Sequence, residues 1–261
     1  MRSYPSSLSD FQWSLICKFF KPSHLGRPVV HPRRRIIDAI LYILRSGCQW
    51  AMLPNDFPPQ RTVCDYFLRW RNSGLWALVS AHLNTAVRKS VGRNPSPSLV
   101  IIDSQSVKGF QGRQLGKGID GFKKVNGRKR HLIVDVLGLI LACVVTPANV
   151  HDSQACELAV EEAFRHQNLD RISLIIADKG YRGDNELLIP MRFHVELKIC
   201  SKPDVQGFEP QPKRWIVERS NAWLSASRRT ARDYEVYPES SVAWTYIANI
   251  RLALGKLRKI A

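Results

Sequence analysis

Three acidic residues in this chain stand where carboxylates could hold a metal ion. Asp103 ends the apolar, β-branched run 99–102, and Asp178 ends a similar run at 172–177. Glu218 follows in a strongly basic stretch. Because the chain has a formal net charge of +17 at pH 7, we expect a magnesium-dependent enzyme that acts on a polyanion. The carboxylates would hold the metal, and lysines and arginines would hold phosphates.

The positions of the two aspartates suggest how they could meet. Ligand sites in α/β sheets lie at the carboxyl ends of strands, where Asp103 and Asp178 are expected. If the two strands are parallel neighbours, both carboxylates project into one crevice. Two ions about 3.5–4 Å apart in such a site can stabilise the attacking and leaving oxygens of a phosphoryl displacement. The competing interpretation is that both aspartates only terminate strands.

A helical wheel places Glu218 opposite an apolar side. That side is made of Ile216, Ser220, Trp223, Leu224 and Ser227, whereas Arg214, Arg229 and Arg232 share the side of Glu218. A helix packed on a sheet would in this way show an acid and phosphate-binding arginines to a crevice. The alternative is that Arg214 and Glu218, four residues apart, form a surface ion pair.

Composition narrows the class of protein. The chain has 261 residues, with 39 basic against 22 acidic side chains and a hydrophobic share of 44%. Such basicity favours nucleic acid as partner over an anionic membrane surface, and no apolar run reaches the roughly 18 residues of a membrane span. Six scattered cysteines indicate reduced thiols rather than a zinc site. Signatures of zinc proteases, P-loop NTPases and α/β-hydrolases are missing from the sequence.

The spacing of apolar residues divides the chain into two regions. Residues 1–90 read as a small all-α domain for DNA binding or dimerisation, 91–98 as a linker, and 99–261 as an α/β domain with a mixed sheet. The expected helices are 33–45, 62–71, 75–89, 153–165, 213–232 and 241–259, with a capped helix after Ser9, and the expected strands are 99–103, 131–136, 139–145, 172–177 and 195–199.

Basic residues gather beside the first aspartate. The glycine-rich segment 108–131 is expected to form a mobile loop that clamps the DNA backbone, although a merely solvated loop is the alternative. The helix at 62–71 could be the recognition element of a helix-turn-helix, unless Tyr66, Phe67 and Trp70 are core residues. The predicted DNA contacts are Lys108, Lys123, Lys124, Arg128, Lys129, Arg130, Arg214, Arg219, Arg228 and Arg229.

Other polar residues are expected around the site rather than on the metal. His131, Asp152 and Tyr181 would support the carboxylates, and magnesium seldom takes imidazole. Asp135 competes for a metal role, but it falls inside a strand of the predicted hairpin.

A series of longer motifs keeps a consistent order over nearly the whole chain. They are Tyr4-Pro5-Ser6 with Trp13, Gly47-Cys48-Gln49-Trp50-Ala51-Met52-Leu53-Pro54, Asp103-Ser104-Gln105-Ser106-Val107-Lys108, residues 127–131 and 147–152, Asp178-Lys179-Gly180-Tyr181-Arg182-Gly183, and the block from Glu218 to Glu235. Together they resemble bacterial insertion-sequence transposases of the DDE type, in the group with a short helical N-terminal region. The chain departs from that family's pattern at Ala51, Gln211, Ser225 and Ala226.

The resemblance implies a ribonuclease-H-like catalytic domain with Asp103, Asp178 and Glu218 as its catalytic, metal-binding triad. It implies two Mg²⁺ ions per site, with Mn²⁺ as a possible substitute. The partners would be double-stranded DNA at element ends and target, and further copies of the chain in a dimer or larger complex. No membrane and no small-molecule substrate are expected. The setting would be the bacterial cytoplasm, at the nucleoid.

Two other functions compete with transposition. A DNA-binding protein without catalysis would keep the basic surface and lose the chemistry. The departures from the family pattern at Gln211, Ser225 and Ala226 favour this alternative. A structure-selective nuclease on the same fold would cut DNA without sequence preference and never join strands.

Overall fold

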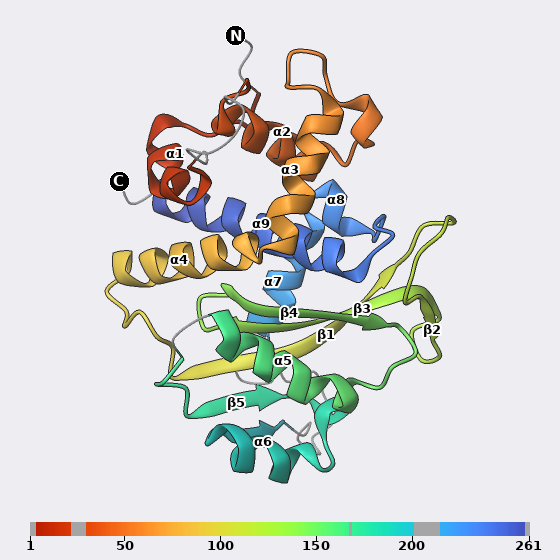
Figure 1. The fold of residues 1–261 in the computed structure, drawn as a ribbon. Coiled ribbons are helices and arrows are strands. Elements are labelled where there is room, and N and C mark those ends of the chain that lie inside the picture. The colour runs from red at the N-terminus through yellow and green to blue at the C-terminus, as the bar shows by residue number, and fades with distance from the viewer. Residues whose placement is uncertain (1–3, 22–29, 167–168, 201–214, 259–261) are drawn as a thin grey trace.

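One mixed sheet with helices on both faces dominates the computed structural model, which describes residues 4–21, 30–166, 169–200 and 215–258 (Figure 1). The helices are α1 (Asp10–Ile16), η1 (Cys17–Phe20), α2 (Arg33–Ser46), η2 (Trp50–Met52), α3 (Gln60–Asn72), α4 (Leu75–Ser90), α5 (Asp152–His166), η3 (Lys179–Tyr181), α6 (Asn185–Phe193), α7 (Trp215–Ser225), α8 (Arg228–Ala231) and α9 (Pro238–Arg258). The strands are β1 (Leu99–Lys108), β2 (Gly118–Asp120), β3 (Val125–Asp135), β4 (Ile140–Pro147), β5 (Leu174–Ala177) and β6 (Glu196–Ile199).

The described strands follow the order β4, β3, β1, β5 and β6, with short β2 beside the start of β3. β1 is antiparallel to β3 and parallel to β5, and β5 is parallel to β6. An antiparallel meander thus leads, through the crossover helix α5, into two parallel strands. This topology confirms the predicted α/β class and the ribonuclease-H-like fold that the resemblance implied.

Alternate residues of β1 enter two different cores, because successive strand side chains point to opposite faces. Ile101 packs with Leu132 in a large core that also contains buried residues of α7 and α9. Val100 and Ile102 pack instead against α5 and α6. The strand is therefore apolar on both faces, as a central strand must be.

The N-terminal helices share the larger core with the sheet. Trp244 of α9 is 1% exposed and stacks on Phe67 of α3, with ring centroids 4.8 Å apart, and Trp50 lies beside both. Figure 1 shows α2, α3 and α4 gathered around α9. Phe67 and Trp70 are therefore core residues, and Tyr66 is half-buried. The division at 91–98 and a DNA-reading role for α3 stay predictions.

Most expected helices and strands are present, but the polar segment 108–131 forms the predicted loop only in part, since β2 and the first half of β3 lie within it. β1 continues beyond Asp103 to Lys108, and β3 begins at Val125. The apolar pattern missed these extensions because their side chains are polar and pair with other groups. Ser104 and Ser106, for example, donate to Asp152 and Asp120.

The basic helix expected over 213–232 is also interrupted. α7 ends at Ser225, and Ser227 has extended backbone angles (φ −98°, ψ 120°) before α8 begins. Helix α6 was not predicted at all, and Pro190 lies within it. The break after α7 lets α8 turn onto α2, so the two short helices contact different neighbours.

A buried ion pair fixes the end of β3. The Arg88 guanidinium of α4 pairs with Asp135, whose carboxylate also accepts the Leu137 and Leu139 amides at 2.9 Å. Arg88 is 5% exposed, and Asp135 is fully buried. Asp135 therefore joins the helical region to the β3–β4 turn, and this structural role accounts for its position.

Removing the Arg88 side chain should destabilise the folded protein, because it leaves the buried Asp135 carboxylate without a countercharge. We expect Arg88→Ala to lower the free energy of unfolding by about 3–5 kcal/mol, measured by urea denaturation. Lys89→Ala, at the exposed neighbouring position, should change it by less than about 0.5 kcal/mol. Equal effects of the two substitutions would contradict a stabilising role for this pair.

Candidate active site

The register of β1 and β5 brings the two predicted aspartates to the same end of neighbouring parallel strands. Leu99 lies opposite Leu174 and Ile101 opposite Ile176, a constant offset of 75 residues (174 − 99 and 176 − 101). β5 ends at Ala177, so Asp178 directly follows the strand, and the same offset continued for two residues would bring it opposite Asp103. Asp178 keeps an extended backbone (φ −85°, ψ 178°), so the alternation of faces continues through it.

Both aspartates point to the side of the sheet that α7 covers. Ile101 and Ile176, two residues before each aspartate, belong to the core that contains Ile216 of α7. Asp103 and Asp178 are half-buried. Asp103 therefore does not end a strand, as we had predicted, but lies in the middle of β1 at the level where β5 ends.

Asp152, at the start of α5, brings a third carboxylate close to Asp178. A Cβ atom on Gly180 would lie 3.0 Å from Asp152 Oδ2 and equally 3.0 Å from Asp178 Oδ1, so these oxygens are at most twice that distance apart. Ser104 Oγ donates to Asp152 at 2.8 Å, and Lys129 Nζ pairs with it at 3.0 Å. Sequence reasoning missed Ser104 and Gly180, although both lie within two residues of a predicted aspartate.

His131 and Tyr181 form a buried polar contact beneath these carboxylates. His131 Nδ1 lies 3.1 Å from the Tyr181 hydroxyl, and its Nε2 lies 3.0 Å from Thr146 Oγ1. Burial is the main cause that lowers the pKa of His131 to about 4, so the ring is neutral at pH 7. Burial, and then the charges of Asp152, Asp103 and Asp178, raise the pKa of Tyr181, which keeps its proton.

Glu218 lies on the exposed side of α7, as the helical wheel predicted. Ile216, Ser220 and Leu224 are buried on the other side, and Ser220 Oγ donates to the Gly138 carbonyl at 3.0 Å. Within the described ranges, no three His, Cys, Asp or Glu side chains are grouped closely enough to hold a metal ion. The structure thus pairs the two aspartates but does not gather Glu218 with them, and its metal role stays a prediction.

The donors that are present suit a hard divalent cation. Mg²⁺ often binds through one or two carboxylates and completes its coordination with water and substrate phosphates. Two half-buried carboxylates at the same end of neighbouring strands fit that requirement. The two aspartates are therefore the residues most able to hold Mg²⁺ here.

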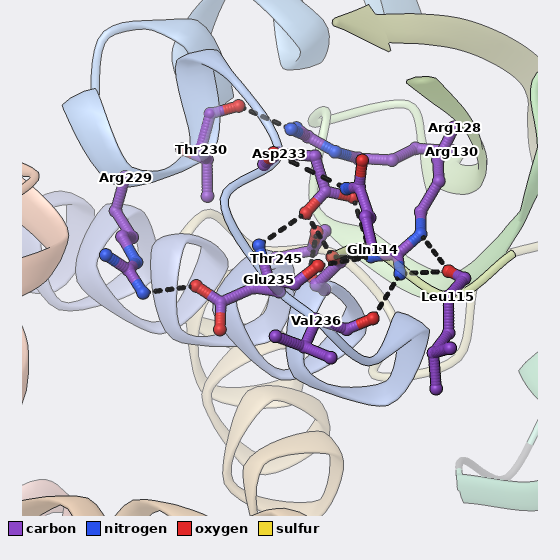
Figure 2. A network of polar contacts seen from close by, with 11 residues as sticks. Gln114, Leu115, Arg128, Arg130, Arg229, Thr230, Asp233, Glu235, Val236 and Thr245 are labelled. Atoms are coloured by element: carbon purple, nitrogen blue, oxygen red, sulfur yellow. Dashed lines mark hydrogen bonds and ion pairs between the residues drawn. The ribbon is translucent and has the colours of Figure 1, made fainter. Parts of the chain in front are cut away.

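Three predicted DNA contacts on β3 must be corrected, because their side chains are buried. Arg128 and Arg130 point toward α8 and α9, and Lys129 points to Asp152. Arg128 is fully buried and pairs with Asp233 at 3.1 Å, as Figure 2 shows. It also donates to the carbonyls of Leu115, Glu235 and Val236. Burial and these internal partners leave no donor of Arg128 available for a phosphate.

Arg229 requires the same correction. Its guanidinium is 8% exposed and pairs with Glu235 in the same buried network (Figure 2). Together Arg128 and Arg130 hold residues 230–236 against the first half of β3. Asp233 and Glu235, at the end of the block noted in the sequence, supply the carboxylates that pair with Arg128 and Arg229.

The other predicted DNA contacts differ in accessibility. Lys108, Lys123, Lys124 and Arg228 are exposed. Arg219 is half-buried, with its guanidinium 4.6 Å from the ring centroids of both Trp215 and Trp223. Arg214 lies outside the described residues. None of the described helices is both long and apolar enough to cross a membrane.

Comparisons with known proteins agree with this geometry. A family model described as "Putative transposase of IS4/5 family" matches residues 8–99, and one described as "Transposase DDE domain" matches residues 94–250, more than half of the chain. A curated relative from Burkholderia cepacia, named "Putative transposase for insertion sequence element IS402", is 29% identical over 114 residues. That match covers 42% of this chain and 54% of the relative, so the chain spans about half of the relative's length.

The buried histidine should make stability depend on pH. The pKa of His131 is about 4 in the folded protein, against its ordinary value of 6.5, so the unfolded chain binds more protons between these pH values. Stability from this group is complete above pH 6.5 and is lost as the pH falls toward 4, by about 3 kcal/mol. In urea denaturation, the His131→Gln protein should not show this loss of stability as the pH falls.

His151→Gln is a suitable control, because that side chain is exposed. It should keep the pH dependence of the wild type. A His131→Gln protein that loses as much stability as the wild type between pH 6.5 and 4 would show that the ring is not buried in its neutral form.

Proposed function

The chain belongs to the DDE transposase family, and we propose that it cuts DNA at the ends of its own mobile element and joins those ends to target DNA. The observation that supports this most is the parallel pairing of β1 with β5, which brings Asp103 and Asp178 to the same end of neighbouring strands in a chain of net charge +17. Recognition of terminal inverted repeats on double-stranded DNA, and assembly of a dimer or larger complex, belong to the same proposal.

Asp103 and Asp178 are the residues that would hold divalent cations, Mg²⁺ or Mn²⁺, with Glu218 as a third ligand and two ions per site. Bound there, the cations would acidify a water molecule and neutralise charge on the transferring phosphate. The place of Glu218 on α7, which covers the same face of the sheet as both aspartates, supports its inclusion.

The residues around the aspartates would limit repulsion between carboxylates. Like charges held close together disfavour ionisation of one another, and Asp152 is within a few ångströms of Asp178. The Lys129 ammonium pairs with Asp152 and so neutralises it locally. Tyr181 and His131 add no charge at pH 7.

Substitution of either aspartate should abolish cleavage without unfolding the protein. We expect Asp103→Asn and Asp178→Asn to lower Mg²⁺-dependent nicking of element-end DNA by at least about 10³-fold, because several kcal/mol of charge stabilisation are lost. Asp184→Asn, a change of the same kind at an exposed position, should cut normally. If wild type and Asp103→Asn nick the DNA equally, or if neither nicks it, the assignment of Asp103 as a catalytic residue is wrong.

A DNA-binding protein without catalysis is the second candidate. The exposed position of Glu218 and the residues Ser225 and Ala226, where the family has basic side chains, favour it. The nicking assay separates the two functions, since such a protein binds the element ends and cuts nothing. Strand-transfer products would in addition exclude a nuclease that only cuts.

Binding should depend steeply on salt if lysine and arginine neutralise phosphates. A protein with 6–10 phosphate contacts loses about 10³–10⁵ in affinity between 50 and 200 mM salt. Lys108→Ala should weaken binding to all DNA sequences alike and reduce the slope of log affinity against log salt by about 1, measured by fluorescence anisotropy. A flat salt response of the wild type would contradict a phosphate-binding surface.

A further inference from the structure

Lys129 of β3 is a buried lysine beside the candidate active site. Its side chain is 11% exposed, and its ammonium pairs with Asp152 Oδ1 at 3.0 Å and donates to the Val150 carbonyl at 2.9 Å. Lysine is rarely buried unless it is paired. Carboxylate and carbonyl oxygens are also the ligands that hard metal cations take, so the ammonium is surrounded in the way that such a cation would be.

Asp152, the partner of this lysine, lies on the face of the sheet that α5 covers. Ser104 Oγ of β1 donates to Asp152 Oδ2 at 2.8 Å, and Ile102, two residues earlier on the same strand, packs in the core with α5. Successive strand side chains point to opposite faces, so Asp103 points to the other face, which α7 covers. Strand β1 thus separates the carboxylates of Asp103 and Asp152.

Asp178 lies near both of these carboxylates, because it directly follows the end of β5. A Cβ atom on Gly180 would lie 3.0 Å from one oxygen of Asp178 and 3.0 Å from one oxygen of Asp152. Asp103 lies on the neighbouring parallel strand. After the larger effect of burial, the charges of all three aspartates raise the pKa of Tyr181. A divalent cation on Asp178 could therefore be shared with Asp103 on one face or with Asp152 on the other.

The Lys129 ammonium decides between these two alternatives. It already neutralises Asp152, which leaves that carboxylate less attraction for a second positive charge. Its own charge also repels any divalent cation that approaches Asp178 from the α5 side, and such repulsion is strong at a partly buried site, where water screens it poorly. On the α7 side, the described structure places no comparable ion pair beside Asp103.

We propose that Lys129 is a positioning residue, a built-in cation that keeps divalent ions away from Asp152 and so reserves Asp178 for ions shared with Asp103. This inference rests on the proposed function, because it takes Asp103 and Asp178 as cation ligands. Catalysis by two ions requires a fixed spacing between them. An ion bound between Asp178 and Asp152, on the wrong face of the sheet, would draw Asp178 away from that arrangement.

The test counts the Mn²⁺ ions that the full chain binds without DNA, from the electron paramagnetic resonance signal of the free ion. We expect Lys129→Met to bind one Mn²⁺ more per chain than the wild type, because Asp152 then lacks its countercharge and can share an ion with Asp178. Asp152→Asn should bind the wild-type number of ions at least about tenfold more weakly, since the ammonium loses its carboxylate and repels nearby cations. The two substitutions thus act in opposite directions.

Three control proteins complete the design. Lys129→Arg keeps the positive charge and should bind the wild-type number of ions. The double substitution Lys129→Met with Asp152→Asn removes both charges and should restore the wild-type number and affinity. Lys198→Met removes an exposed lysine of β6 and should change neither. An ion pair with a structural role alone would not produce this pattern, and circular dichroism shows which variants are folded.

A folded Lys129→Met protein that binds as many Mn²⁺ ions as the wild type would overturn the role of Lys129 and leave the proposed function standing. If that variant does not fold, Asp152→Asn decides, and an unchanged Mn²⁺ affinity overturns the role. An extra ion that persists in the double variant would also overturn it, because that ion would not depend on Asp152. A wild-type protein that binds no Mn²⁺ would instead refute Asp103 and Asp178 as cation ligands, and the proposed function with them.

Discussion

β1 and β5 pair in parallel, with residues 75 positions apart opposite one another. This pairing brings Asp103 and Asp178, which lie 75 residues apart in the chain, to the same end of neighbouring strands. Apolar residues on both faces of β1 hold the register, since a slip by one residue would exchange the two cores. The site therefore depends on packing far from the carboxylates themselves.

Alternation along β3 separates two groups of charged residues. Arg128 and Arg130 point to the side of α8 and α9, whereas Lys129 and His131 point to the side of Asp152 and Tyr181. Buried charges of this kind are tolerated only when they are paired and hydrogen-bonded. Arg128 and Arg130 in this way attach the last helices to one face of the sheet. On the other face, Lys129 of the same basic run neutralises Asp152.

The sequence was informative wherever apolar periodicity was strong. The central strands and the exposed side of α7 followed from alternating or helical patterns. Polar strand extensions did not, because Ser104 and Ser106 are strand residues only through partners distant in the chain. Arg128 and Arg229 were predicted to contact DNA because the sequence shows only their charge. Their internal partners, carboxylates and carbonyls that lie far away in the chain, could not be recognised from composition.

The shared core of the N-terminal helices and α9 has a consequence for shortened forms of the protein. Trp244 is covered by Phe67 and Trp50, so a truncation that begins near residue 99 would strip an apolar helix surface of its cover. Such a fragment would tend to aggregate rather than act as a separate nuclease module. Internal initiation or proteolysis at the 91–98 segment would thus inactivate the protein instead of releasing an unregulated enzyme.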